Sequence, residues 1–246
     1  MPLMSPAVII IPVYNHCHQI HAVIQRAKRL HLPIIVVDDG STDATPFVLQ
    51  RISGIALLRH PVNRGKGAAI LTGMQAAANL THAAITMDAD GQHEPAAAVK
   101  LLRAAARQPQ PTIVVGARMG MRERNVPESS RIGRRFSNFW VRCAGGPRLS
   151  DSQSGFRLYP LPQTLQLDVR SRRFQFEIEV LVKAHWHGLP IIETAVPVYY
   201  QSPNQRISHF DPWKDSWRNG RVFSRLIFRL ITQSPLGCRL STDENR

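Results

Sequence analysis

The sequence predicts an α/β fold in which a mostly parallel central sheet is flanked by helices. Short runs rich in isoleucine and valine alternate with longer, alanine-rich amphipathic segments through the first half of the chain. The runs are apolar almost without interruption, as in strands that are covered by helices on both faces. With 246 residues, 43% of them hydrophobic, the chain can form one large domain with an elaborated C-terminal part.

The first half of the chain supplies the strands and helices of this sheet in alternation. Each strand is predicted from a β-branched run, such as AVIIIPV or PIIVVDD, and each helix from the amphipathic segment between two runs. This order makes neighbouring strands parallel. The expected strands cover residues 7–13, 33–39, 55–60, 83–88 and 112–117, and the expected helices cover residues 17–31, 43–52, 66–80 and 95–107.

After residue 117 the pattern changes. The segment RERNVPESSRIGRR is polar and basic and is expected to be mobile, and FSNFWVRCAGG after it predicts a helix that ends at a glycine pair. DSQSGFRLY predicts a loop and a strand, FQFEIEVLVKAHWHG a helix, and PIIETAVPVYY an extended segment. We divide the chain into a main domain, residues 1–200, and a basic amphipathic C-terminal extension, residues 201–246, with a helix at about 213–232.

Charge and cysteine content limit the classes of partner and compartment. The chain has 31 Lys and Arg against 17 Asp and Glu, a formal net charge of +14, which favours anionic partners such as nucleic acid, phosphorylated ligands or a membrane surface. Its three cysteines are far apart and form neither a disulfide framework nor a metal-ligand spacing. No segment approaches the ~20 apolar residues of a membrane span, so we expect a cytoplasmic protein that is soluble or peripherally attached.

Acidic residues gather where predicted strands end, which is where parallel sheets bind ligands. Asp88 and Asp90, in DADGQHEP, would repel each other unless positive charge lies between them. Their spacing suits a hard divalent cation, with Gln92 or His93 completing its ligands. The alternative is that the two acids pair with some of the chain's many arginines. His93 is expected to be a loop or supporting residue and not a catalytic base.

Two further motifs indicate a nucleotide. Asp38 and Asp39 end a strand in VVDDGSTDAT; turn and helix-capping chemistry explains the residues after them but not two adjacent acids, which suit a base or ribose. NRGKGAAI is a glycine-rich turn that opens a helix, and its backbone N–H groups with Lys66 favour a phosphate. A helix start with a chance lysine is the alternative. The Walker and G-x-G-x-x-G spacings are absent.

Four motifs together resemble a known family. PVYN, DDGSTD, NRGKGAA and DADGQHEP, in this order at the ends of successive predicted strands, resemble a family-2 glycosyltransferase with the GT-A nucleotide-sugar-binding fold. The most similar branch is that of the polyprenyl-phosphate (dolichyl-phosphate) hexose synthases. DSQSGFR and FEIEVLVKA extend the resemblance to about residue 200. Any one motif is weak, whereas four in order with suitable spacing are strong.

The resemblance implies a donor site for a UDP- or GDP-hexose. Pro12, Tyr14, Asp38 and Asp39 would hold the base and ribose, and Lys66 would lie near the nucleotide or its phosphates. The residues that the resemblance assigns to the metal and to the acceptor lie in other segments of the chain.

The resemblance also implies a metal and an acceptor site. Asp88 and Asp90 would bind Mg²⁺ or Mn²⁺ together with Gln92, and Asp90 would thereby take part in catalysis. In this branch, basic residues after the fifth strand contact an acceptor phosphate, and Arg118 and Arg131 occupy comparable places. The sequence around Arg131 is only loosely similar to the branch.

The family implies inversion at the anomeric carbon and leaves the acceptor open. A phosphate acceptor of a lipid is already anionic and needs no strong base, whereas a hydroxyl of another lipid or glycan needs a carboxylate to take its proton. Glu177, or else Asp151, would be that base. Alternatively, Glu177 and Glu179 form a helix face paired to Arg173 or Lys183.

The C-terminal helix carries aromatic and aliphatic residues among several arginines, which is typical of a helix at a membrane interface. Docking on the domain with its basic face in water is the alternative. We expect peripheral contact at the inner face of the cytoplasmic membrane and no nucleic-acid partner. A basic nucleic-acid-binding protein and a metal-dependent nucleotidyltransferase are the other functions that charge and paired acids allow.

Overall fold

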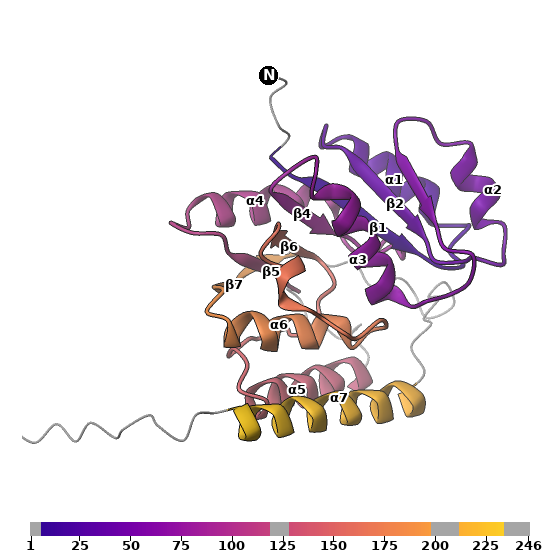
Figure 1. Cartoon of the computed structure of the whole chain (residues 1–246). Coiled ribbons are helices and arrows are strands. Elements are labelled where there is room, and N and C mark those ends of the chain that lie inside the picture. Colours follow the sequence, from indigo (N-terminus) through magenta and orange to yellow (C-terminus); the bar gives the residue numbers. More distant parts are fainter. Residues whose placement is uncertain (1–5, 119–127, 198–211, 234–246) are drawn as a thin grey trace, which may run out of the picture.

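The computed structural model describes residues 6–118, 128–197 and 212–233. A seven-stranded sheet with the order β3-β2-β1-β4-β6-β5-β7 runs through the molecule (Figure 1). The paired strands are parallel except for β6, which runs antiparallel to both β4 and β5. The predicted mostly parallel α/β sheet is therefore confirmed. The strands are β1 Val8–Val13, β2 Ile34–Asp38, β3 Ala56–Arg59, β4 Ala83–Thr86, β5 Ile113–Arg118, β6 Arg157–Pro160 and β7 Ile191–Val196.

Helices cover both faces of this sheet. Buried residues of α1, α2 and α4 pack on one face, and those of α3 and α6 pack on the other. A third layer, α5 and α7, lies on the far side of α6 from the sheet (Figure 1). The helices are α1 Ile20–Lys28, α2 Thr45–Gln50, α3 Lys66–Ala77, α4 Ala98–Ala106, α5 Glu128–Cys143, α6 Phe176–Trp186 and α7 Pro212–Gln233, with short 3-10 turns η1 Pro95–Ala97 and η2 Leu165–Leu167.

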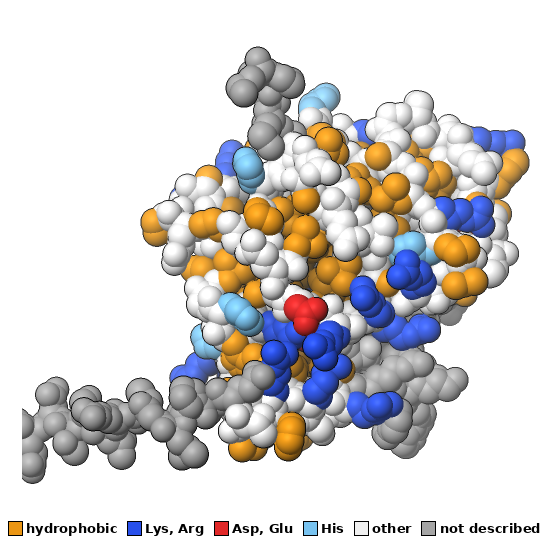
Figure 2. All heavy atoms as spheres, in the orientation of Figure 1, with side chains coloured by type: hydrophobic (Ala, Val, Ile, Leu, Met, Phe, Trp, Pro, Cys, Tyr) orange, Lys and Arg blue, Asp and Glu red, His pale blue; other side chains and the backbone are white. Residues whose placement is uncertain are grey.

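The third layer differs from the sequence-based expectation at one end. Helix α5 begins at Glu128, eight residues before the predicted start at Phe136, so this part of the basic segment expected to be mobile is helical. Helix α5 packs against α6 and α7 through a small apolar cluster. This tertiary contact stabilises the helix and cannot be read from the basic segment itself. Figure 2 shows basic side chains gathered in the lower half of the visible face, around the place of α6 and α7. The rest of the expected mobile segment, residues 122–127, lies outside the described residues.

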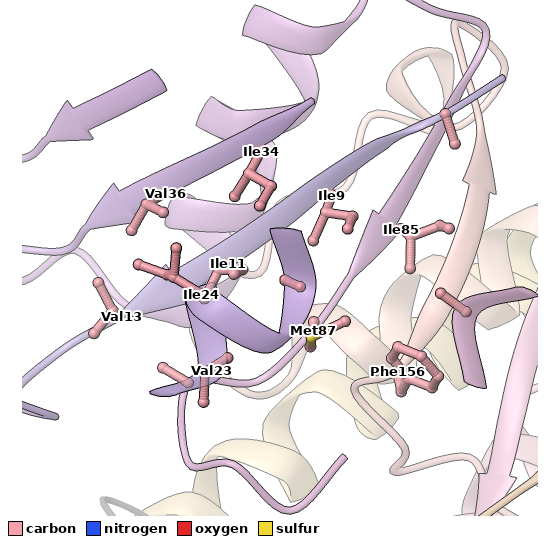
Figure 3. Packing of buried hydrophobic residues seen from close by; sticks show 14 of the residues in the cluster. Ile9, Ile11, Val13, Val23, Ile24, Ile34, Val36, Ile85, Met87 and Phe156 are labelled. Carbon is pink, nitrogen blue, oxygen red and sulfur yellow. The ribbon is translucent and has the colours of Figure 1, made fainter. Parts of the chain in front are cut away.

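The core positions the ends of the strands. Alternate residues of β1, such as Ile9, Ile11 and Val13, point toward α1 and are completely or almost completely buried (Figure 3). Their neighbours in the strand, Val8 and Ile10, pack under α3 on the opposite face. Strands β1 and β2 are buried along their whole length, so the polar side chains that follow them can reach solvent only beyond the strand ends.

Candidate active site

A cavity of about 570 Å³ opens at the carboxyl ends of β1, β4 and β5. Most of the predicted site residues line it, although they come from five separate segments: Pro12, Tyr14, Asp39, Lys66, Asp88, Asp90, Gln92 and Arg118. Four predicted residues lie outside its lining, namely Asp38, Arg131, Asp151 and Glu177. The principal expectation, that the strand-end motifs converge on one site, therefore holds for the geometry.

The two acids of DDGSTD face different surroundings. Asp39 accepts hydrogen bonds from the backbone N–H groups of Arg64 (2.9 Å) and Gly65 (2.7 Å), and its carboxylate lies 2.7 Å from Nδ1 of His60. Asp38 accepts from the backbone N–H of Ser41 and lies 3.2 Å from Nε of Arg59. Asp39 therefore joins the DDGSTD loop to the glycine-rich turn while it borders the cavity. Contact of either acid with a base or ribose stays a prediction.

The glycine-rich turn is shaped by close approach to the segment before α6. Gly65 has a φ of +101°, which favours glycine, and a Cβ there would lie 2.6 Å from the carbonyl oxygen of Arg172. The backbone N–H of Ala68 donates to that same oxygen at 2.8 Å. The N–H groups of Arg64 and Gly65 hold a protein carboxylate, whereas the side chain of Lys66 lines the cavity with Asn63 and Gly65.

Lys66 lies between two carboxylates. Its Nζ is 2.6 Å from Oδ1 of Asp88 and 2.6 Å from Oε1 of Glu177, which is 111 residues away in the sequence. Burial alone would lower the pKa of Lys66, but the charges of Asp88 and Glu177 raise it well above its usual value. Asp88 thus has a basic partner, as the alternative interpretation of the acidic pair expected, although that partner is a lysine and not an arginine.

Asp88 and Asp90 differ in protonation behaviour. Burial opposes ionisation of Asp88, yet the charges of Lys66 and His93 lower its pKa overall. Burial, followed by the charge of Asp88, raises the pKa of Asp90, whose Oδ1 accepts a hydrogen bond from the backbone N–H of Gln92 at 3.0 Å. Asp90 therefore gains most from additional positive charge.

His93 packs beside this pair. Its ring stacks on Phe156 with 5.1 Å between centroids, and its Nε2 lies 3.9 Å from Oδ2 of Asp88. Burial lowers the pKa of His93 despite the two nearby aspartates. The ring therefore packs at the cavity wall, and its supporting role stays a prediction.

Comparison with known proteins decides the family. Residues 8–161, well over half of the chain, match Glycosyl transferase family 2. The chain belongs to this family. It is therefore a glycosyltransferase, and the strand-end cavity is the candidate active site of one. The match begins with β1 and ends just after β6, so it includes every motif that lines the cavity except those before α6.

Individual relatives are similar over most of their length. The UDP-N-acetylglucosamine–dolichyl-phosphate N-acetylglucosaminyltransferase of Methanococcus voltae is 28% identical over 214 residues, which cover 78% of this chain and 85% of the relative. The polyprenol monophosphomannose synthase of Mycolicibacterium smegmatis is 26% identical over 201 residues, covering 76% of this chain and 75% of the relative.

A solved structure shows the same fold. The mannosyltransferase of Pyrobaculum calidifontis, solved in complex with GDP-Man and Mn²⁺, matches with a TM-score of 0.56 and 17% identity. The match covers 88% of this chain but 61% of that chain, which is less than two thirds of its length. The predicted GT-A fold of this family-2 glycosyltransferase is thereby confirmed.

The donor atoms of the cavity suit a cation that is shared with a ligand. Among residues 6–118, 128–197 and 212–233, no three His, Cys, Asp or Glu side chains cluster in a way that could hold a metal ion by themselves. Mg²⁺ in nucleotide sites is commonly bound by one or two carboxylates, with phosphate and water oxygens completing the octahedron. Asp88 and Asp90 meet this requirement, and Gln92 adds an amide oxygen at the same cavity wall.

The two candidate bases of the glycosyltransferase, Asp151 and Glu177, each form an ion pair with a basic side chain. Asp151 is fully buried and receives two hydrogen bonds from the guanidinium of Arg118, at 2.7 and 2.8 Å. Burial alone would raise the pKa of Asp151, but Arg118 lowers it overall. Glu177 is bound to Lys66. Asp151 thus fixes Arg118 at the cavity wall, and a role for either acid as a base stays a prediction.

The cavity also includes residues that were not predicted as site residues. Arg173 and Phe174, from the segment before α6, and Gln153, from the DSQSGFR loop, line it beside His16 and Asn63. The short segment RRF carries no spacing that distinguishes a ligand contact from an ordinary basic loop. Only the packing of that segment against the glycine-rich turn brings Arg173 to the site.

Proposed function

We propose that this glycosyltransferase moves a hexosyl group from a UDP- or GDP-sugar to a lipid acceptor, with a polyprenyl phosphate as the candidate acceptor, and that it needs Mg²⁺ or Mn²⁺. The observation that carries the proposal is the single cavity in which the Asp88–Asp90 pair, Lys66 and Arg118 lie together. One relative named for a UDP-sugar and dolichyl phosphate, and another named for polyprenol monophosphomannose, support it.

Each of the cavity residues would have a distinct role in such a reaction. Asp88 and Asp90 would hold the cation, and Gln92 would complete its protein ligands. Bound there, a divalent cation stabilises the negative charge of the departing nucleoside diphosphate. Lys66 would contribute a second positive charge to the diphosphate when its pairing with Asp88 is exchanged for the ligand.

Arg118 suits an anionic acceptor. It ends β5, borders the cavity and is held by Asp151 from behind, so its guanidinium is fixed in orientation before a ligand arrives. A phosphate acceptor is already nucleophilic, so the reaction would need no carboxylate free to take a proton. Both predicted bases are engaged in ion pairs, which favours a phosphate over a hydroxyl acceptor.

Membrane contact completes the proposal. None of the helices within the described part of the chain is both long and apolar enough to cross a bilayer. We propose peripheral attachment at the inner face of the cytoplasmic membrane, with α7 as the contact, because a polyprenyl phosphate presents its head group at that surface.

The acidic pair provides the first test. Wild-type chain and Asp90→Asn are titrated with UDP, GDP and their hexose conjugates, with and without Mn²⁺, by calorimetry. We expect one nucleotide to bind in a metal-dependent way and Asp90→Asn to bind it about tenfold or more weakly, since one cation ligand loses its charge. Nucleotide binding that is indifferent to both metal and variant would refute the metal-dependent site.

The acceptor is tested by product analysis. With the donor identified, polyprenyl phosphate and the corresponding polyprenol are offered as acceptors in detergent, and products are identified by mass spectrometry. Glycosylation of the phosphate alone is expected. Glycosylation of the alcohol would show that a hydroxyl acceptor is used and that a base must be found, and release of pyrophosphate would identify a nucleotidyltransferase.

A further inference from the structure

Exposed apolar side chains are concentrated on the third layer of the fold. Half of the large hydrophobic residues that are exposed within the described chain lie on α5 and α7, and the others are scattered over the main domain. A layer of two helices would ordinarily hide such residues, so this concentration is a surface feature that packing does not explain. The exposed fractions on the two helices are Ile132 66%, Phe136 53%, Phe139 57%, Phe228 69% and Ile231 71%.

The exposed residues of α5 form one stripe. Ile132, Phe136 and Phe139 recur at the i, i+4 and i+7 spacing of a single helix face. Arg135 and Arg142, each three residues after a member of the stripe, are exposed on that face as well. From residue 131 to residue 143 the helix has no acidic side chain, so the stripe combines apolar and positive groups alone.

Helix α7 presents the same combination. Phe223 and Leu226 are buried against α5 and α6, whereas Phe228 and Ile231 are exposed. Arg221 is exposed along the same helix, whereas the exposed Arg225 already pairs with the buried Glu179, and no acidic residue occurs from 219 to 232. The inward apolar residues of α7 therefore dock the helix, and its outward ones are left for another contact.

The two helices lie side by side (Figure 1). Trp140 of α5 packs on Phe223 of α7 with 5.9 Å between ring centroids, and the rings of Phe136 and Phe139 contact Trp140 edge-on. Figure 2 shows hydrophobic side chains at the lower edge of the visible face, where α7 lies, with basic side chains above them. The exposed aromatic residues of α5 are thus anchored to the ring that joins the two helices.

Charge decides what this surface fits. A second copy of the chain in a two-fold dimer would place the same arginines opposite one another, without acidic side chains on these helix segments to compensate. An anionic bilayer offers phosphate groups for the arginines and acyl chains for phenylalanine and isoleucine, which is the combination that interfacial helices use. Nucleic acid would satisfy the arginines but would leave the aliphatic side chains in water.

We infer that α5 and α7 together form one binding face for an anionic lipid bilayer, and that Ile132, Phe136 and Phe139 of α5 enter the head-group region beside Phe228 and Ile231 of α7. The inference rests on the proposed membrane contact of α7 and extends it to a second helix. Helix α5 is the element that follows β5 along the chain, and β5 ends at Arg118 in the cavity lining.

Vesicle flotation tests the inference without any substrate. The full chain is mixed with vesicles of phosphatidylcholine or of a phosphatidylcholine–phosphatidylglycerol mixture and floated through a density gradient. The variants are Phe136→Ser/Phe139→Ser on α5 and Phe228→Ser/Ile231→Ser on α7. Phe47→Ser/Leu80→Ser is the matched control, because its side chains are exposed to similar degrees (55% and 52%) on other elements.

We expect wild type and control to float with anionic vesicles, and each helix variant to partition about tenfold more weakly, since it loses two apolar side chains at the interface. Added salt should weaken binding of all forms. The two-helix face is overturned if only the α7 variant loses flotation, or if the wild type does not float. It is also overturned if light scattering shows a dimer that the helix variants disrupt. The same holds if duplex DNA competes with the vesicles and the apolar substitutions have no effect on binding.

A nucleotide-binding measurement distinguishes failure of the membrane face from failure of the proposed function. The α5 variant should bind the nucleotide as the wild type does, because its substituted residues lie outside the cavity lining. Flotation that fails while metal-dependent nucleotide binding persists would overturn the membrane face alone, and the converse would leave the face in place without the proposed chemistry.

Discussion

At the scale of single residues, the site depends on how a few charges are shared. Lys66 pairs with both Asp88 and Glu177, and Arg118 is held by Asp151, so these two cavity cations are positioned by carboxylates from other segments. Such paired charges are held in place before a ligand arrives, which reduces the cost of organising the site. The arrangement leaves little space around the Lys66–Asp88 pair.

Gly155 provides the test of that spacing. A Cβ at this position would lie 2.7 Å from both Oδ2 of Asp88 and Nζ of Lys66. Gly155→Ala should therefore displace the pair and reduce glycosyl transfer by about tenfold or more, while the free energy of unfolding falls by only about 1–3 kcal/mol. Activity and thermal unfolding are measured together.

Gly220→Ala on α7 is the matched control, because a Cβ there meets nothing within 4 Å. It should leave transfer unchanged and stabilise the helix by about 0.5–1 kcal/mol. Equal activity of both variants would show that the position of the Asp88–Lys66 pair is unimportant for the reaction.

At the scale of elements, Glu179 joins three parts of the structure. This carboxylate is buried in α6, accepts hydrogen bonds from the backbone N–H and hydroxyl of Ser171, and pairs with Lys183 (3.2 Å) and with Arg225 of α7 (2.8 Å). Burial alone would raise the pKa of Glu179, but these hydrogen bonds and charges lower it. The contact thus holds α7 on α6 and is a source of pH-dependent stability.

Glu179→Gln should lower the free energy of unfolding by about 3–5 kcal/mol near pH 7, because it leaves the buried ammonium of Lys183 without its carboxylate. In the wild type the folded-state pKa lies below the unfolded value of about 4.3, so the unfolded chain binds more protons between the two values. The stability from Glu179 is therefore present above about pH 4.3 and disappears as the pH falls toward the folded-state pKa.

Urea unfolding of both forms as a function of pH measures this effect, and the difference between wild type and Glu179→Gln should shrink below about pH 4.3. Asp168→Asn is the control, since the side chain of Asp168 is 74% exposed and its pair with Arg170 is solvent-screened. A difference that stays constant with pH would contradict a depressed pKa of Glu179.

At the scale of the whole molecule, the C-terminal helix is part of the packed structure. Phe223 and Leu226 of α7 are buried in one cluster with Val141 of α5 and with Ile178 and Val182 of α6. The sequence predicted a main domain at 1–200 and a basic amphipathic extension at 201–246. Because α7 is packed on α5 and α6, removal of the extension should affect the main domain.

A chain that ends at residue 200 should be markedly less stable than the full chain. Burial of Phe223 and Leu226 contributes about 3–6 kcal/mol, and Glu179 would lose Arg225. We expect a lower Tm and aggregation by the exposed faces of α5 and α6, measured by calorimetry and light scattering. An unchanged Tm in a monodisperse shortened chain would show that the extension is independent of the main domain.

The sequence by itself determined the alternation of strands and helices, the family and the acidic strand-end motifs. Burial on two faces makes a strand a continuous apolar run, and a ligand site needs polar groups at the point where the run stops, so both signals are local. Eight of the predicted residues accordingly line one cavity, Asp88 and Asp90 among them.

Only the tertiary structure decided the partners of those residues. The antiparallel insertion of β6 between β4 and β5, the pairing of Lys66 with Glu177 over 111 residues, and the docking of α7 on α5 and α6 all join segments that are far apart in the sequence. A charge or an apolar stripe shows that a residue needs a partner, but several distant segments can supply one, and only packing of the whole chain selects among them.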